Sequence, residues 1–260
     1  MHYLDNAATT RVADTVADTA DAVSRAHYAN PSSLYAPGAQ SEFVLSGARE
    51  TVAASLGAQP GEIVFTACGS EGNNLAVLGA VKARAAWADH IVVTGYEHPS
   101  VQNPVAALEK EGWRVTVVRP DASGHVDAGA LVRAVGSKTA LVTAMHVNNE
   151  VGSILDVAAL AKAVKEKNSR GRTSTAYRRG AGPGPNGTHR QLRGVGHKIH
   201  APKGGRAVCA PRLHPPPCFW AAGRSRSVVR APKTWPISPP ARAIERMLAD
   251  GGCAGARGAE

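Results

Sequence analysis

A lysine that directly follows a histidine is the strongest chemical signal in this sequence. It stands in Gly196-His197-Lys198, and a turn containing Pro and Gly, residues 201–204, comes soon after. A lysine amine condenses with an aldehyde to form an imine, so this pattern indicates an attachment point for an aldehyde cofactor. Alone, the same residues would also suit a solvated basic loop. The prediction therefore depends on what the rest of the chain places around them.

A possible phosphate-binding turn lies in residues 65–74. Small residues, among them Gly69 and Ser70, separate an apolar run from a helical pattern. Backbone N–H groups and the dipole at a helix N-terminus bind phosphate, and the Ser70 hydroxyl can add a further hydrogen bond. Taken alone, the segment is better explained as a capped strand-to-helix turn without a ligand.

Two more segments place polar side chains just after apolar runs. His98, in residues 97–100, could stack on a flat cofactor or move a proton. The amides in residues 145–152 could bind a phenolate oxygen or a substrate. An ordinary surface histidine and an Asn-rich loop are the alternatives. Because ligands bind beyond the carboxyl ends of parallel strands, all four segments together predict one site.

The elements that must position these residues alternate along residues 1–167. The expected helices are 15–26, 41–56, 70–86, 101–111, 128–135 and one capped by Asp156; the expected strands are 62–66, 90–94, 114–118 and 140–145. The strands are near-continuous apolar runs, which is typical of strands buried on both faces. The pattern predicts a three-layer α/β domain over residues 1–167, with a mostly parallel sheet flanked by helices.

The composition changes after Lys167. Residues 168–240 contain 14 Lys and Arg, 11 of the 17 prolines and no Asp or Glu, whereas residues 1–167 hold 13 basic and 17 acidic residues. Such a segment buries too little apolar surface to offset its chain entropy, so we expect a largely irregular basic region around the Lys198 motif. The sequence pattern of residues 241–260 predicts a short helix followed by a tail.

Several classes of protein are not indicated. The four cysteines have no CxxC or CxxH spacing, so neither a metal site nor a disulfide framework is predicted. No apolar run approaches the roughly 18 residues that cross a bilayer, and the first five residues do not form a signal peptide. We expect a cytoplasmic protein without membrane contact.

The motifs resemble those of the NifS-type cysteine desulfurases, which are class V, fold-type I pyridoxal-phosphate enzymes. The segments that carry the resemblance are residues 3–10, 30–33, 65–76, 97–98, 145–152 and 196–204. The resemblance is nearly continuous over residues 1–167 and is then confined to the last of these segments.

This resemblance implies a role for each candidate residue. Lys198 would bind pyridoxal 5'-phosphate covalently and shuttle the substrate proton, and His98 would stack on the pyridine ring and assist proton transfer. The remaining cofactor-binding residues would be Gly69 and Ser70 for the phosphate, Asn149 for the ring oxygen, and His197 for the phosphate or ring pocket.

The resemblance also implies a reaction and partners. The family converts L-cysteine to L-alanine and passes the sulfur to an enzyme cysteine as a persulfide, for iron–sulfur cluster or thio-cofactor assembly. A sulfur-acceptor or scaffold protein and a homodimer with active sites at its interface would follow.

Three departures from the family pattern stand out. No Asp occurs between Asp156 and Asp250, so the usual partner of the pyridinium nitrogen is absent. Val195 replaces the usual Ser before Gly-His-Lys, and the 62 residues after Lys198 lack the surroundings of the persulfide cysteine. Out-of-frame translation of residues 168–193 and 205–240, together with truncation, would explain the missing Asp and the missing surroundings of the persulfide cysteine. We therefore expect an impaired or inactive enzyme.

Two alternatives remain at this point. The chain could be another class V enzyme, such as a selenocysteine lyase or an aminotransferase. It could also be a non-catalytic relic whose basic residues 168–240, with Trp220 and Trp235, bind nucleic acid. The Lys198 motif has no place in such an arm, which argues against a nucleic-acid partner.

Overall fold

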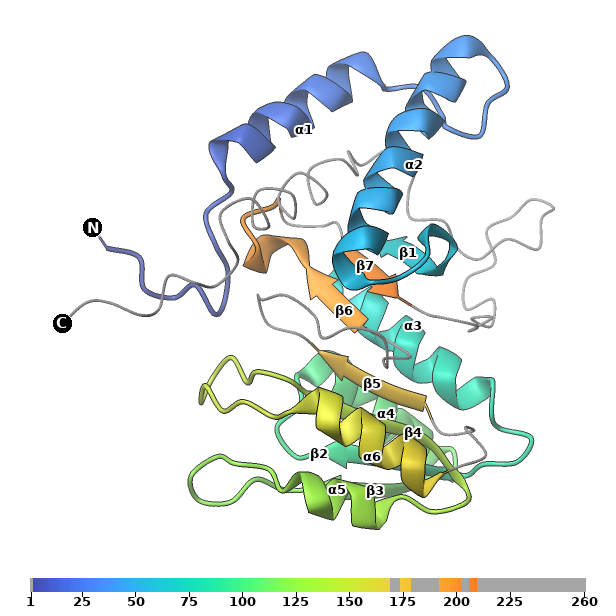
Figure 1. Cartoon of the computed structure of the whole chain (residues 1–260), viewed down its shortest axis with the longest axis vertical. Coiled ribbons are helices and arrows are strands. Elements are labelled where there is room, and N and C mark those ends of the chain that lie inside the picture. Colours follow the sequence, from blue (N-terminus) through green and yellow to red (C-terminus); the bar gives the residue numbers. More distant parts are fainter. Residues whose placement is uncertain (1, 169–173, 179–191, 203–205, 210–260) are drawn as a thin grey trace.

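A seven-stranded sheet with helices on both faces is the framework of the molecule (Figure 1). The computed structural model describes residues 2–168, 174–178, 192–202 and 206–209. The helices are α1 (Asp14–Ala26), α2 (Ala36–Leu56), α3 (Gly69–Lys82), α4 (Pro99–Lys110), α5 (Ala128–Ala134) and α6 (Val157–Lys167), with short 3-10 helices η1 (Pro60–Glu62) and η2 (Gly196–Lys198). The strands are β1 (Ile63–Thr66), β2 (His90–Thr94), β3 (Arg114–Val118), β4 (Thr139–Met145), β5 (Ser174–Arg178), β6 (Leu192–Val195) and β7 (Arg206–Cys209).

All strands except β7 run in the same direction. The order across the sheet is β1-β7-β6-β5-β4-β2-β3. The pairs β2–β3, β2–β4, β4–β5 and β5–β6 are parallel, whereas β7 pairs antiparallel with both β1 and β6. Strand β1 therefore points the same way as β6. This arrangement confirms the predicted three-layer α/β fold with a mostly parallel sheet.

Alternate side chains of the central strands pack into two separate cores. Val92 and Val142 face a cluster formed with α2, α5 and α6. Ile91 and Leu141, one position earlier in each strand, face a second cluster formed with α3 and α4. Because successive strand residues point to opposite faces, an uninterrupted apolar run is what a sheet covered on both sides requires.

Helix α6 shows how a local signal produces an element. The Asp156 side chain accepts hydrogen bonds from the backbone N–H groups of Ala158 and Ala159, at 3.0 and 2.9 Å. These bonds satisfy donors that have no partner in the first helical turn. The expected apolar stripe is buried as predicted: Val157, Leu160, Ala161 and Val164.

Some boundaries differ from the expected ones. Helix α2 begins at Ala36, because Pro37 is compatible with the first helical turn. Helix α3 ends at Lys82 and is followed by turns, short of the expected residue 86. Strand β3 has the expected bounds but is partly exposed, since it lies at the edge of the sheet.

Strands β5, β6 and β7 lie within residues 168–240, where the composition predicts a largely irregular basic region. All three belong to the same sheet as β1–β4. Strand pairing depends on backbone hydrogen bonds to neighbours such as β4, so tertiary context can override a weak side-chain pattern. The helix expected near residue 241 and the rest of the basic segment lie outside the described residues.

Among the described residues, no helix combines the length and the apolar character needed to cross a membrane.

Candidate active site

The four segments selected from the sequence follow strands that end at one edge of the sheet. Residues 67–70 follow β1, residues 95–98 follow β2, residues 146–152 follow β4, and η2 follows β6. Since these four strands point the same way, their carboxyl ends lie along the same side of the sheet, which we call its carboxyl edge. The strand order places β6, and with it Lys198, between β1 and β4. In open α/β sheets this edge is where ligands bind.

The turn between β1 and α3 has the features of a phosphate site. Cys68 caps α3, and its Sγ accepts the N–H of Glu71 at 3.5 Å. The Glu71 carboxylate in turn accepts the N–H of Ala67 at 2.6 Å, which closes the turn. Gly69 and Ser70 occupy the first turn of α3, where the helix itself offers no carbonyl to their N–H groups. These donors and the exposed Ser70 hydroxyl suit an anion.

His98 is held by a short chain of hydrogen bonds. It caps α4, and its Nδ1 accepts the backbone N–H of Ser100 at 3.1 Å. The Ser100 Oγ lies 2.7 Å from the same Nδ1. The Asn73 side chain, on α3, donates from Nδ2 to that Oγ. Asn73 and Ser100 are buried, whereas the His98 ring is exposed at the edge.

Asn74 joins this group to the phosphate turn. Its Nδ2 donates to the carbonyl oxygen of Ser70 at 2.8 Å and lies 3.5 Å from the carbonyl oxygen of Ser100. The starts of α3 and α4 are therefore tied together, and Ser70 and His98 belong to one polar group. The sequence predicted both residues, but it did not indicate that Asn73, Asn74 and Ser100 connect them.

The loop after β4 is shaped by Asn148. Its Oδ1 accepts the N–H groups of Glu150 and Val151 at 2.8 and 3.0 Å. Its Nδ2 donates to the carbonyl oxygen of Tyr96 at 3.3 Å, which links this loop to the one that carries His98. The neighbouring Asn149 is half-buried. Of the two adjacent amides, Asn148 is thus the structural one.

The Lys198 turn is fixed by the N-terminal segment. The carbonyl oxygen of His197 accepts the N–H and the hydroxyl of Thr10 at 2.7 and 2.9 Å. The Thr10 Oγ1 also accepts the N–H of His200 at 2.8 Å, and His200 Nδ1 donates to the carbonyl oxygen of Arg11 at 3.0 Å. His200 has a φ of 61°, a left-handed conformation that non-glycine residues adopt at some cost. These contacts hold Lys198, which is half-buried, at the end of β6.

Strand β5 contains no Asp or Glu. It pairs in parallel with β4, and its residues read Ser-Thr-Ala-Tyr-Arg. A strand therefore stands where the resemblance implies one, but without the Asp that would pair with a pyridinium nitrogen. The residues present fit the phosphate, the aldehyde and the ring oxygen of the expected cofactor; β5 supplies no counter-charge for its ring nitrogen.

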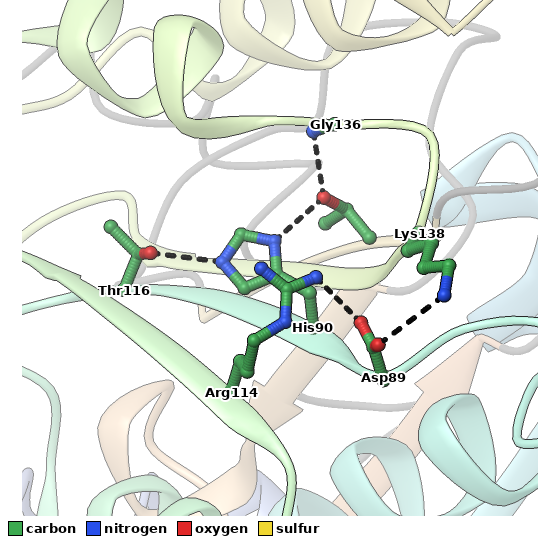
Figure 2. A network of polar contacts seen from close by, with 7 residues as sticks. Asp89, His90, Arg114, Thr116, Gly136 and Lys138 are labelled. Atoms are coloured by element: carbon green, nitrogen blue, oxygen red, sulfur yellow. Dashed lines mark hydrogen bonds and ion pairs between the residues drawn. The ribbon is translucent and has the colours of Figure 1, made fainter.

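A second cluster of polar residues lies at the amino ends of the strands, on the side of the sheet opposite the candidate site (Figure 2). The buried His90 begins β2, and its ring nitrogens lie 2.9 Å from the hydroxyl oxygens of Thr116 and Thr139. Asp89 forms ion pairs with Arg114, at 2.6 Å, and with Lys138, at 3.8 Å. This group joins the amino ends of three strands, away from the candidate site, and we interpret it as structural.

These charges and the burial shift two pKa values. Burial, assisted by the Arg114 charge, lowers the pKa of His90. The hydrogen bond from Arg114 lowers the pKa of Asp89. The buried imidazole is therefore held neutral next to an ionised pair.

Comparison with known proteins shows the family to which the chain belongs. The sequence profile of the family described as Aminotransferase class-V matches residues 2–171. A cysteine desulfurase of Nostoc sp. (strain PCC 7120) is 40% identical over 204 residues, which are 78% of this chain and 51% of that protein. The mitochondrial cysteine desulfurase of Drosophila melanogaster is 34% identical over 232 residues, covering 87% of this chain and 50% of that protein.

Solved structures agree as well. One described as a NifS-like protein superposes with a TM-score of 0.87 at 30% identity, covering 95% of this chain and 70% of its own. DndA from Streptomyces lividans gives a TM-score of 0.81 at 32% identity, with 96% and 73% covered.

The chain belongs to the class V aminotransferase family of pyridoxal-phosphate enzymes. Within that family, the relatives and the fold group it with the NifS-type cysteine desulfurases. It spans about half the length of the curated relatives that it matches.

Proposed function

We propose that this chain is a pyridoxal-phosphate-dependent cysteine desulfurase that takes sulfur from L-cysteine and leaves L-alanine. The observation that carries the proposal is the convergence of a phosphate turn, a histidine, an amide loop and a lysine at one sheet edge. The similarity to cysteine desulfurases supports the choice of reaction within the class V family. Residues 2–168 and strands β5–β7 would together form the cofactor-binding domain.

Each candidate residue receives a role from its place at that edge. The N–H groups of Gly69 and Ser70 would bind the phosphate, and the amine of Lys198 would bind the aldehyde. Asn149 would bind the ring oxygen, and His98 and His197 would line the ring and phosphate pocket. When bound, pyridoxal phosphate withdraws electron density from the bonds around the substrate's α-carbon. The chain's own part is to orient the substrate and to hold the proton at Lys198 Nζ.

The composition of β5 supports weak activity. A protonated ring nitrogen is the strongest electron acceptor in this cofactor, and it needs a nearby carboxylate to stay protonated. Strand β5 offers none, and the whole sequence between Glu166 and Glu245 contains no acidic residue. We therefore expect turnover well below that of a protein with the carboxylate, even where the cofactor binds.

The partners follow from the same proposal. Transfer of the sulfur would require a cysteine that receives it as a persulfide and an acceptor protein that takes it onward, in iron–sulfur cluster or thio-cofactor assembly. The proposal also includes a homodimer and a cytoplasmic location. Size measurement by light scattering tests the dimer independently of activity.

Binding of pyridoxal phosphate to purified protein is the decisive test. A visible absorption band that remains after gel filtration, and that is lost in Lys198→Ala, is the expected result. Lys165→Ala, on the exposed side of α6, is the matched control and should keep the band. A band of equal strength in Lys198→Ala would contradict the assignment of the amine.

The reaction is tested with different substrates. Release of alanine and sulfide from L-cysteine supports desulfuration. Preference for selenocysteine, or transfer of the amino group to a 2-oxo acid, would instead support the other class V activities.

A further inference from the structure

The proton on the His98 ring can be located from its hydrogen bonds. The backbone N–H of Ser100 points at Nδ1 from 3.1 Å. An amide N–H can only donate, so Nδ1 must accept and carries no proton. A neutral imidazole has one N–H, which must then be on Nε2. The contact at 2.7 Å between Nδ1 and the Ser100 Oγ is consequently a bond that the hydroxyl donates.

Asn73 determines which way that hydroxyl points. Its Nδ2 donates to the Ser100 Oγ, so the oxygen accepts from one side and turns its hydrogen toward His98. Both side chains are buried, with 1% and 8% of their surface exposed. Buried hydrogen bonds in a chain are hard to rearrange, because an unsatisfied polar group there is costly.

Capping of α4 does not require this arrangement. The bond from the Ser100 N–H to His98 already satisfies the cap, and alanine at position 100 would preserve it. The hydroxyl and the Asn73 amide add a second donor to the same nitrogen. Their effect falls on the protonation state of the ring rather than on the start of the helix.

We propose that Asn73 and Ser100 are positioning residues that hold His98 as its Nε2–H tautomer. With Nδ1 occupied by two donors, the neutral ring offers a proton from Nε2 and cannot accept one there. In the resting protein, His98 would therefore donate a hydrogen bond from Nε2 to a ligand bound at the carboxyl edge of the sheet. The relevance of this state to catalysis rests on the proposed function, but the state itself does not.

The tautomer is measured directly by NMR on protein without cofactor. Histidine labelled with ¹⁵N at both ring positions gives different two-bond ¹H–¹⁵N patterns for the two tautomers. The signal of His98 is identified by its absence in His98→Gln. In the wild-type chain at neutral pH we expect the Nε2–H pattern.

Two variants test the role of the positioning residues. Ser100→Ala removes one donor to Nδ1 and should shift the tautomer ratio about fivefold toward Nδ1–H. This is the change in equilibrium that the loss of one typical net hydrogen bond produces. Asn73→Asp keeps the shape but replaces the donor with an acceptor, which draws the Ser100 hydrogen away from His98. It should shift the ratio in the same direction. Ser100→Thr keeps the hydroxyl and should retain the wild-type pattern.

The outcomes separate this inference from the proposed function. An Nδ1–H pattern in the wild-type chain, or an unchanged ratio in both Ser100→Ala and Asn73→Asp, overturns it. If these variants lower only the melting temperature, Asn73 and Ser100 are structural and the inference is wrong. If the tautomer behaves as expected but pyridoxal phosphate does not bind, the inference stands and the proposed function fails.

Discussion

At the scale of single residues, neighbours in the sequence have different tasks. Asn148 shapes its loop through three hydrogen bonds, whereas Asn149 is the residue proposed for the cofactor. In the same way, the His197 carbonyl anchors the turn that presents Lys198. At these two places a side chain or carbonyl beside the proposed site residue fixes the backbone. Residue type alone could not distinguish the two amides of the loop.

We expect Asn148→Ala to destabilise the protein by about 2–3 kcal/mol, because three net hydrogen bonds are lost. Asn148→Asp is the matched control. It keeps the two bonds that Oδ1 accepts and loses the one donated to the Tyr96 carbonyl, so its cost should be smaller. Urea unfolding measures both. An alanine variant as stable as the wild type would show that the loop does not depend on Asn148.

At the scale of elements, the first turn of α2 can pack closely against the preceding chain only because it contains Gly38. The first turn of α2 packs against the preceding turn, where Ser33 N–H donates to the Asn30 carbonyl at 2.9 Å. A Cβ placed on Gly38 would lie 2.6 Å from the Ser33 carbonyl oxygen and 2.9 Å from that of Asn30. Only glycine allows this approach, since the obstructing atoms belong to the backbone.

Gly38→Ala should therefore lower stability by about 1–3 kcal/mol, as overpacked sites do. Gly47→Ala, in the same helix, is the control. A Cβ there meets nothing within 4 Å, so the higher helix propensity of alanine should raise stability by about 0.5–1 kcal/mol. Opposite shifts of the melting temperature are expected in thermal unfolding. Shifts of the same sign would contradict the packing described for Gly38.

At the scale of the whole molecule, the carboxyl and amino ends of the strands carry different kinds of residues. The carboxyl edge gathers the residues proposed for chemistry, most of them exposed or half-buried. The amino edge carries the His90 group, which joins β2, β3 and β4 (Figure 2). A histidine kept neutral by burial couples global stability to pH.

Stability should decrease as the pH falls below about 6.5. His90 has a lowered pKa in the folded protein, so the unfolded chain binds the proton first as acid is added. This contribution is present above the unfolded pKa and is lost as the pH falls toward the folded one. His90→Gln should lose less stability than the wild type between pH 7.5 and 5.5 in urea unfolding. Equal losses in both proteins would exclude His90 as the source.

The sequence by itself determined the alternation of helices and strands over residues 1–167, because buried parallel strands need continuous apolar runs and a helix such as α6 begins at a capping residue, Asp156. It also indicated His98 and the phosphate turn, which each follow an apolar run, and Lys198, which stands in the Gly-His-Lys motif. Only the tertiary structure decided that β5–β7 join the sheet, since pairing relies on backbone groups that every residue has. The same holds for the contact of Asn73 with Ser100, which lie 27 positions apart. Such contacts depend on how two helices pack, and no local pattern records that.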